Sequence, residues 1–316
     1  MRKFFALFLV VAFCAAGAPA QTQQPAPTLS IVAEDGNRLP AELFYGNTKV
    51  KPVRLRPGTN TPITIDDADF FVQQHYIDFL SRFPDQGGFA HWQNEILGCG
   101  TDARCRDIKR QNVSAAFFLS IEFQDTGYFV YRIRKAAFGD LPGKPVPVRR
   151  ESFLADTRGI SNGIIVGQGD WEPRLRANKD AYALATVNSG SFRAVFDGLT
   201  AAQFVDKLDQ NAGGGVLDAA ERQTLISRLA TNTAANRAAV LRAVAEDETL
   251  RVREFNKAFV LMQYFGYLKR NPDDAPDINY NGYFFWLGKL NDFNGNFVRA
   301  QMVKAFIESI EYRARF

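Results

Sequence analysis

The sequence predicts a mainly all-α protein built from repeated three- to four-helix modules, with a short irregular or β-stranded arm on its N-terminal side. Three observations support this fold class. Large apolar residues recur at helical spacing from Asp66 onward. A long aromatic-rich motif occurs twice in the same internal order. Before Asp66, extended-chain patterns are interrupted by prolines and glycines, which disfavours a regular helix there.

The chain opens with a segment typical of a cleaved signal peptide. Arg2 and Lys3 precede an apolar stretch over 4–16, and Ala18-Pro19-Ala20 supplies the small residues that a signal peptidase recognises. We therefore expect residues 1–20 to be a signal peptide that is cleaved after Ala20. The mature protein would then be secreted or held at the cell surface, with the periplasm as a further location.

Two other interpretations of this opening segment are disfavoured by its details. A membrane anchor would need about 20 apolar residues to span a bilayer, and this stretch is shorter. A lipidated Cys14 would need a small residue before it, and Phe13 stands there instead. No later segment of the sequence is long and apolar enough to span a membrane, so we expect no transmembrane segment.

The charge and composition exclude some classes of partner. The full sequence has 38 basic and 34 acidic residues, for a net charge of +4, and loss of Arg2 and Lys3 lowers that charge by two. Such a balance lacks the basic excess of a nucleic-acid-binding protein, and it would not attract anionic membranes in general. The apolar fraction of 46% is that of an ordinary globular protein.

Residues 21–65 read as a Pro-rich leader followed by an extended arm. The leader covers 21–27, and extended-chain patterns follow at Leu29-Ser30-Ile31-Val32 and over 50–55. The prolines between them favour an irregular arm or a short hairpin.

Two cysteines remain once the signal peptide is removed. Cys99 and Cys105 enclose a short polar loop, and such a pair in an exported protein is a credible disulfide. The alternative is a zinc site, which needs two further ligands. His75 and His91 are the only histidines in the sequence, and neither falls into a zinc pattern with the cysteines.

The first helical module is expected over 66–140. Its first helix should run from about Asp67 to Arg82, and Pro84 and Asp85 should end it and cap the second. The second helix carries Phe89, Trp92 and Ile96 on one face. A third helix is expected over 102–123 and a fourth over 128–138.

The motif of this module recurs near the end of the chain, and we expect a second helical module over 256–316. The repeated positions, given as first copy and second copy, are Phe71/Phe259, Val72/Val260, Tyr76/Tyr264, Arg82/Arg270, Pro84/Pro272, Asp85/Asp273, Trp92/Trp286, Ser120/Ser309 and Glu122/Glu311. We expect the aspartates to cap the second helices, the arginines to close the last turn of the first helices, and the tryptophans to be core residues beside the tyrosines.

Between these modules, 141–255 is expected to be a middle helical region. A degenerate third copy is one interpretation of it, because Phe204-Val205 opens a helix that Thr200 and Gln203 can cap, and Asp218 and Glu221 can cap the next. The tryptophan and the Arg-x-Pro-Asp turn are missing there, so the sequence does not decide whether this region is a degenerate copy.

At these residues the chain resembles domain-of-unknown-function family 4214, a helical module of exported and surface bacterial proteins that is similar in fold to phycobilisome linker domains. The resemblance covers Asp66–Phe123 and Ala258–Phe316. In the second copy, Ala275–Asn281 is an insertion, and the glycine that precedes the tryptophan in the first copy, Gly88, is expected at a different position. The family has no assigned catalytic residues or cofactor, so the resemblance implies an exported, non-enzymatic module. It does not imply pigment binding.

Two short motifs resemble ligand sites and are better explained as turns. Gly167-Gln168-Gly169 lacks the third glycine of a dinucleotide-binding fingerprint, because Glu172 stands at that position. We expect a glycine-rich loop there, followed by a helix that Asp170 caps. Asp277, Asn279 and Asn281 match the first half of an EF-hand loop, but Gly288 replaces the bidentate carboxylate that calcium needs. These three residues remain a weak calcium candidate, and we expect no cofactor.

Two functional hypotheses follow. The first is a surface or extracellular protein for interaction, assembly or adhesion, with a protein or glycan of the cell envelope or exterior as its unknown partner. The second is an exported hydrolase, including one that acts on glycans, with no recognisable motif. No Gly-x-Ser-x-Gly elbow is present, and the 28 Phe, 10 Tyr and 3 Trp are mostly explained by helix packing. The first hypothesis is therefore preferred.

Overall fold

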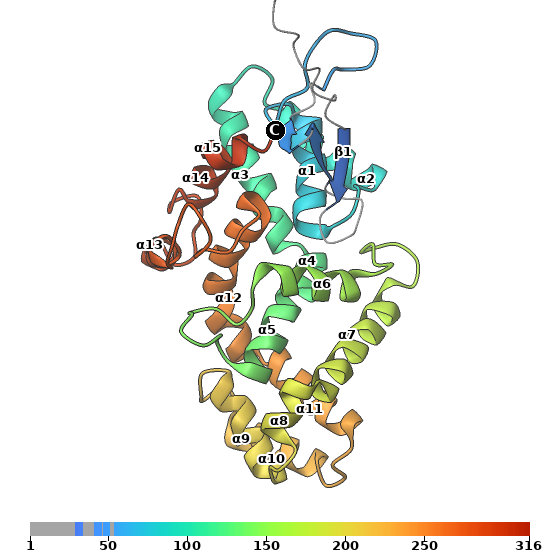
Figure 1. Ribbon diagram of the computed structural model, residues 1–316, viewed down its shortest axis with the longest axis vertical. Helices are drawn as coiled ribbons and strands as arrows, with labels where there is room; N and C mark the ends of the chain where they lie inside the picture. Colours follow the sequence, from blue (N-terminus) through green and yellow to red (C-terminus); the bar gives the residue numbers. More distant parts are fainter. Residues whose placement is uncertain (1–28, 34–40, 46, 51–53) are drawn as a thin grey trace, which may run out of the picture.

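The computed structural model describes residues 29–33, 41–45, 47–50 and 54–316. The expected signal peptide over 1–20 and the leader over 21–27 lie outside these residues. Helices dominate the described chain from Ala68 onward, which confirms the predicted all-α class (Figure 1). Among the described residues, no helix combines the length and the apolar character needed to cross a membrane.

A small antiparallel sheet is the β element of the N-terminal arm. Its strands are β1 (Leu29–Ala33), β2 (Ala41–Tyr45) and β3 (Thr48–Val50), paired in that order. Leu29 pairs with Tyr45 in the first ladder, and Tyr45 pairs with Thr48 in the second. Figure 1 places the sheet at the end of the molecule that also holds α1 and α2.

The first module has the helices that the sequence predicts, with one break. Helix α1 (Ala68–Leu80) ends where Ser81 turns left-handed at φ 54°, and α2 (Gln86–Leu97) follows. The third helix is not continuous over 102–123 as expected. It divides into α3 (Ala103–Leu119) and α4 (Ile121–Asp125), because Ser120 is extended and its hydroxyl accepts the N–H of Phe123. Helix α5 (Gly127–Phe138) then stops at Gly139.

The middle region consists of helices joined by loops. Its helices are α6 (Arg150–Ser161), α7 (Trp171–Asn188), α8 (Gly190–Phe196), α9 (Ala201–Asn211), α10 (Ala219–Arg228) and α11 (Ala234–Glu246). Helices α9 and α10 begin with the reciprocal capping boxes that the sequence predicts, formed by Thr200 with Gln203 and by Asp218 with Glu221. Each box satisfies backbone N–H groups that a helix start leaves unpaired.

The last module begins inside a long helix. Helix α12 (Glu248–Gln263) crosses the module boundary that was expected at 256 and continues into the π-helical turn η2 (Tyr264–Leu268). Lys269 then turns left-handed at φ 58°, as Ser81 does in the first module. Helices α13 (Asn281–Asp292), α14 (Met302–Glu308) and α15 (Ile310–Arg313) complete it.

The described part of the chain contains four related helical units, although the sequence motif revealed two and suggested a third. A fully buried Phe-Val pair occurs in four helices: Phe71-Val72 in α1, Phe129-Val130 in α5, Phe204-Val205 in α9 and Phe259-Val260 in α12. Each pair is followed along the chain by an extended capping residue with ψ between 136° and 146°: Ser120, Ser189, Asp247 and Ser309. Each cap accepts the N–H of a buried apolar residue three positions later.

The first and last modules pack directly against each other, and one hydrophobic core runs through the molecule. Phe118 of α3 stacks on Phe259 of α12, with ring centroids 4.4 Å apart. The Phe79 ring lies against Gly266. A Cβ added to this glycine would come within 2.6 Å of the Cζ atom of Phe79. The π-helical turn places this glycine at the contact, so α1 and η2 approach closely. In Figure 1, α14 correspondingly lies beside α3.

Candidate interaction surface

The repeated arginines tie each module together through a carboxylate. Arg82 makes a bidentate pair with Glu122, with Nε–Oε1 and Nη2–Oε2 distances of 2.8 and 2.7 Å. Arg270 pairs with Glu311 in the same way, at 2.6 and 3.1 Å. The expectation that these arginines close the last turn of the first helices was wrong, because both lie beyond the helix ends and their side chains bind carboxylates on α4 and α15. The guanidinium groups also lie over the Tyr76 and Tyr264 rings.

The repeated aspartates have different roles in the two modules. Asp85 caps α2, because its Oδ1 accepts the N–H of Gly88 at 2.8 Å. Asp273 does not cap α13, which corrects the prediction. Residues 274–280 separate it from that helix, whose N-cap, Tyr280, makes no side-chain capping bond. Asp273 instead binds Lys144 and Arg149, and so joins the last module to the middle region. Both motif prolines precede these aspartates: Pro84 is half-buried and Pro272 is buried.

The repeated tryptophans are half-buried, whereas full core burial was expected. Helices α2 and α13 lie on the outer side of their modules, so one part of each indole remains open to solvent. The Trp92 ring packs on Phe117 with a centroid separation of 6.2 Å, and Trp286 packs on Phe306 at 5.7 Å. Tyr76 and Tyr264 contact the same two phenylalanines. Each tryptophan therefore covers an aromatic cluster with one part of its ring.

The glycine before each tryptophan occupies the same place in both modules, so the expected displacement in the second copy was wrong. Gly282 lies four residues before Trp286, as Gly88 lies four before Trp92. A Cβ on Gly88 would come within 2.2 Å of the Tyr76 hydroxyl, and one on Gly282 within 2.6 Å of the Tyr264 hydroxyl. The repeated tyrosine thus requires a glycine opposite it.

A buried polar chain links the two modules at His75. The Nδ1 of His75 lies 2.7 Å from the Phe71 carbonyl, so this nitrogen must be the donor. The Nε2 then accepts from the Ser114 hydroxyl at 2.6 Å, and Ser114 accepts from Tyr267. Burial lowers the pKa of His75 to about 4. All of these side chains are enclosed, so the His–Ser pair cannot reach a substrate in this conformation. His91, by contrast, is exposed beside Trp92.

A second buried polar cluster joins the same modules. Asp78 of α1 binds Lys269 at 2.8 Å and Arg315 at 2.8 and 2.9 Å. Burial alone would raise the pKa of Asp78, but the two cations outweigh it and lower the pKa to about 2. Burial lowers the pKa of Lys269 to about 8. The residues of this cluster fall outside the repeated motif, which is why sequence reasoning missed it.

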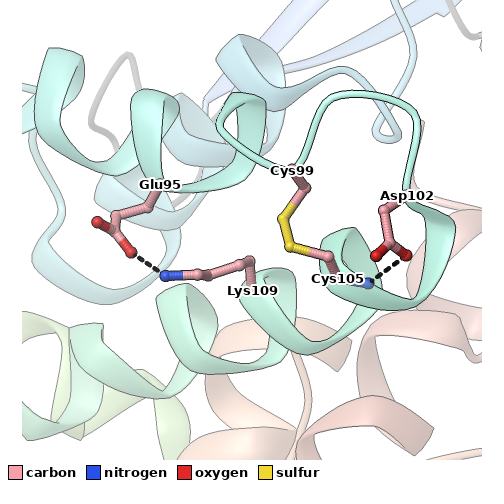
Figure 2. The surroundings of a disulfide bond; sticks show 5 residues. All are labelled: Glu95, Cys99, Asp102, Cys105 and Lys109. Atoms are coloured by element: carbon pink, nitrogen blue, oxygen red, sulfur yellow. Dashed lines mark hydrogen bonds and ion pairs between the residues drawn. A yellow bond between two sulfur atoms is a disulfide. The ribbon is translucent and has the colours of Figure 1, made fainter.

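Cys99 and Cys105 form a disulfide, with a Cα–Cα distance of 5.5 Å. Figure 2 shows the bond between the end of α2 and the first turn of α3. Asp102 caps α3 by accepting the N–H of Cys105 at 3.0 Å, and Lys109 pairs with Glu95 at 2.5 Å across the same two helices. The bond therefore holds the start of α3 against α2, and it is consistent with an oxidising compartment.

The two ligand-like motifs are engaged in local structure. Asp277 binds Arg270 at 2.8 Å, and Asn279 accepts the N–H of Asn281 at 2.9 Å. Within the described residues, no group of three acidic, histidine or cysteine side chains gathers as a metal site. Gly167-Gln168-Gly169 lies in the loop before α7. The expectation that Asp170 caps this helix was wrong, because its side chain makes no capping bond.

Large apolar side chains are exposed on α13 and in the loop before it. Ile278 is 88% exposed, Phe284 53% and Phe285 55%. Ile278 and Phe284 line an open hollow of about 620 Å³ together with Lys144, Asp273 and Tyr280. A second hollow, of about 500 Å³, lies between α12 and the C-terminal half of α13. Exposed aromatic residues beside concave surfaces are typical of interaction sites.

Comparisons with protein-family models, with curated proteins and with solved structures found no match. The resemblance to family 4214 therefore remains an expectation from the motif residues alone.

Proposed function

We propose that this protein is an exported, non-enzymatic helical module protein that binds a partner at the cell surface or outside the cell. The observation that carries the proposal is the exposed apolar surface formed by Phe284 and Phe285 of α13 and by Ile278 in the loop before that helix. An exposed cluster of large apolar side chains carries a solvation cost, which binding to a partner would remove.

The internal repeat supports this interpretation. With the tryptophans aligned, the positions of Phe284 and Phe285 correspond to Ala90 and His91 in the first module. The first module forms the same helix with an alanine and a histidine there, so the fold does not require phenylalanine at either position. We therefore assign the two phenylalanines to binding rather than to packing.

The proposed location rests on two further features. The disulfide between Cys99 and Cys105 suits an oxidising compartment. The signal-peptide pattern over 1–20 and the resemblance to family 4214 both imply export. The alternative of an exported hydrolase has less support, because the enclosed His75 and Ser114 offer no access to a substrate.

A module-swap variant tests the proposal. Phe284→Ala together with Phe285→His gives the last module the residues of the first. The variant and the wild type are immobilised, exposed to envelope and medium fractions of the producing cell, and compared by quantitative mass spectrometry. We expect equal melting temperatures and at least one partner that the variant loses. Identical captured sets at equal stability would refute the proposal.

A further inference from the structure

The hollow between α12 and α13 has a cationic wall. Arg251, Arg253 and Lys257 line it, and no acidic residue does. Two of these cations have carboxylate partners outside the hollow: Arg251 pairs with Glu248, and Lys257 pairs with the buried Glu254. Arg253 differs from these two cations, because its side chain donates to the backbone carbonyls of Gly214 and Gly215 and pairs with no carboxylate of residues 54–316. The positive charge of Arg253 is therefore not compensated, and it favours an anionic ligand.

The apolar part of the hollow is aliphatic at its surface. Val252, which is 63% exposed, and Leu287 line it from the two helices. Phe255 also lines it, but its ring is held in the core by edge contacts with Phe118 and Tyr128. Sugar recognition typically uses an aromatic ring with a free face. An aliphatic wall instead suits the apolar side chain of a peptide.

Amide groups at the same hollow suit a peptide backbone. The Nδ2 of Asn256 donates to the Oδ1 of Asn291 at 2.9 Å. This bond leaves the Oδ1 of Asn256 as an acceptor and the Nδ2 of Asn291 as a donor, which is the pair that a peptide group requires.

The two hollows lie along the same face of α13. Phe284 lines the first hollow, and Leu287 and Asn291 line the second. These positions follow helical spacing, so they share a face of the helix. Such a stripe offers an elongated surface, which an extended chain can follow better than a compact small molecule can.

We infer that this groove, defined by Arg251, Val252, Arg253, Asn256, Leu287 and Asn291, binds an extended acidic peptide segment of a partner protein. An aliphatic side chain of the peptide sits against Val252 and Leu287, and flanking carboxylates pair with the cations. The inference rests on the proposed function and names the chemistry of its partner.

The test is fluorescence anisotropy with the full mature chain and a labelled nine-residue peptide of alternating glutamate and leucine. Two comparison probes are a peptide of alternating lysine and leucine and a labelled oligogalacturonate. Val252→Asp places a negative charge in the groove, which should repel the acidic peptide. Because Val252 is exposed, the substitution should not affect folding. Val252→Lys adds a favourable charge at the same position. Arg104→Glu, at the exposed first turn of α3, is the control for net charge, because it lowers the charge by two where Val252→Asp lowers it by one.

We expect the acidic peptide to bind, with an affinity that falls as salt is added. Val252→Asp should weaken binding about tenfold, whereas Val252→Lys and Arg104→Glu should not weaken it. The inference is overturned if the acidic peptide fails to bind, if the lysine peptide or the oligogalacturonate binds as well, or if Val252→Asp has no effect. If the peptide test fails but the module-swap variant still loses a partner, the proposed function stands and only the peptide inference is wrong. If the module-swap variant loses no partner either, the proposed function and the peptide inference are both wrong.

Discussion

At the scale of single residues, the repeat shows which side chains the module needs. His75 and Gln263 occupy equivalent positions, and each donates a hydrogen bond to the carbonyl four residues earlier, at 2.7 and 3.0 Å. The arginine–glutamate pairs and the glycines opposite the tyrosines are likewise duplicated. The sequence predicted that these positions are structural, but it could not identify the partner of each arginine, because pairing depends on how α1 meets α4.

The glycine opposite Tyr264 gives the sharpest prediction at this scale. Gly282→Ala should destabilise the protein by about 1–2 kcal/mol, because the added Cβ meets the tyrosine hydroxyl at 2.6 Å. Tyr264→Phe in the same chain should restore stability, since the next ring atom lies 3.9 Å away. Chemical denaturation measures both. Gly288→Ala is the control, and it should stabilise α13 by about 0.5–1 kcal/mol because nothing lies near it. If the effects of Gly282→Ala and Tyr264→Phe on the free energy of unfolding were additive, the proposed contact would be contradicted.

The buried histidine gives a prediction about pH. The pKa of His75 falls from its usual 6.5 to about 4 on folding, so between these values the unfolded chain binds a proton that the folded chain does not. Stability should therefore decline as the pH falls through this window, by up to about 1.4 kcal/mol per pH unit from this group. His75→Gln, which copies the equivalent Gln263, should remove that part of the decline. Chemical denaturation of the wild type and the variant between these pH values isolates the contribution of His75, because the carboxylates contribute equally in both proteins. Parallel stability curves would refute it.

At the scale of elements, helix starts were easier to predict than breaks. Asp85, Thr200 and Asp218 cap helices as their side chains suggest, because capping is a local interaction. The break at Ser120 was missed, since Ala116 to Phe123 has an unbroken helical pattern of apolar residues. Its signal in the sequence is weak: a serine or aspartate three residues before a buried apolar side chain is an extended cap at four places, but the same spacing occurs inside α3 at Ser114 and Phe117. The prediction that Asp273 caps α13 was wrong because an inserted segment separates the two, and the sequence does not specify the conformation of that segment.

The two third helices differ in length, and the longer one has a disulfide in its first turn. Helix α3 starts at Ala103, whereas α14 starts only at Met302, the equivalent of Val113, and has no disulfide. Replacing Cys99 and Cys105 with serine should lower stability by about 2 kcal/mol, the low end for a short loop. Hydrogen exchange should accelerate in the first turns of α3 and stay unchanged in α14. Uniform acceleration throughout the molecule would contradict this local role.

At the scale of the whole molecule, the first and last modules form one body that the middle units extend. The Asp78 cluster and the His75 chain cross between these modules, and Arg315 also donates to the carbonyl of Tyr267 at 2.8 Å. The sequence predicted the modules but not their pairing, because residues such as Lys269 and Arg315 have no repeated pattern. The pairing leaves α13 at the outer edge in Figure 1, where its apolar surface is open.

The central claim is that the repeat builds the scaffold and that α13 of the last module binds the partner. Photo-crosslinking tests it most directly, with benzoylphenylalanine placed at Phe284 or at the equivalent exposed Ala90 in the producing cell. The account predicts a discrete covalent adduct from position 284 and none from position 90. Adducts of equal yield from both positions, or none from position 284, would contradict it.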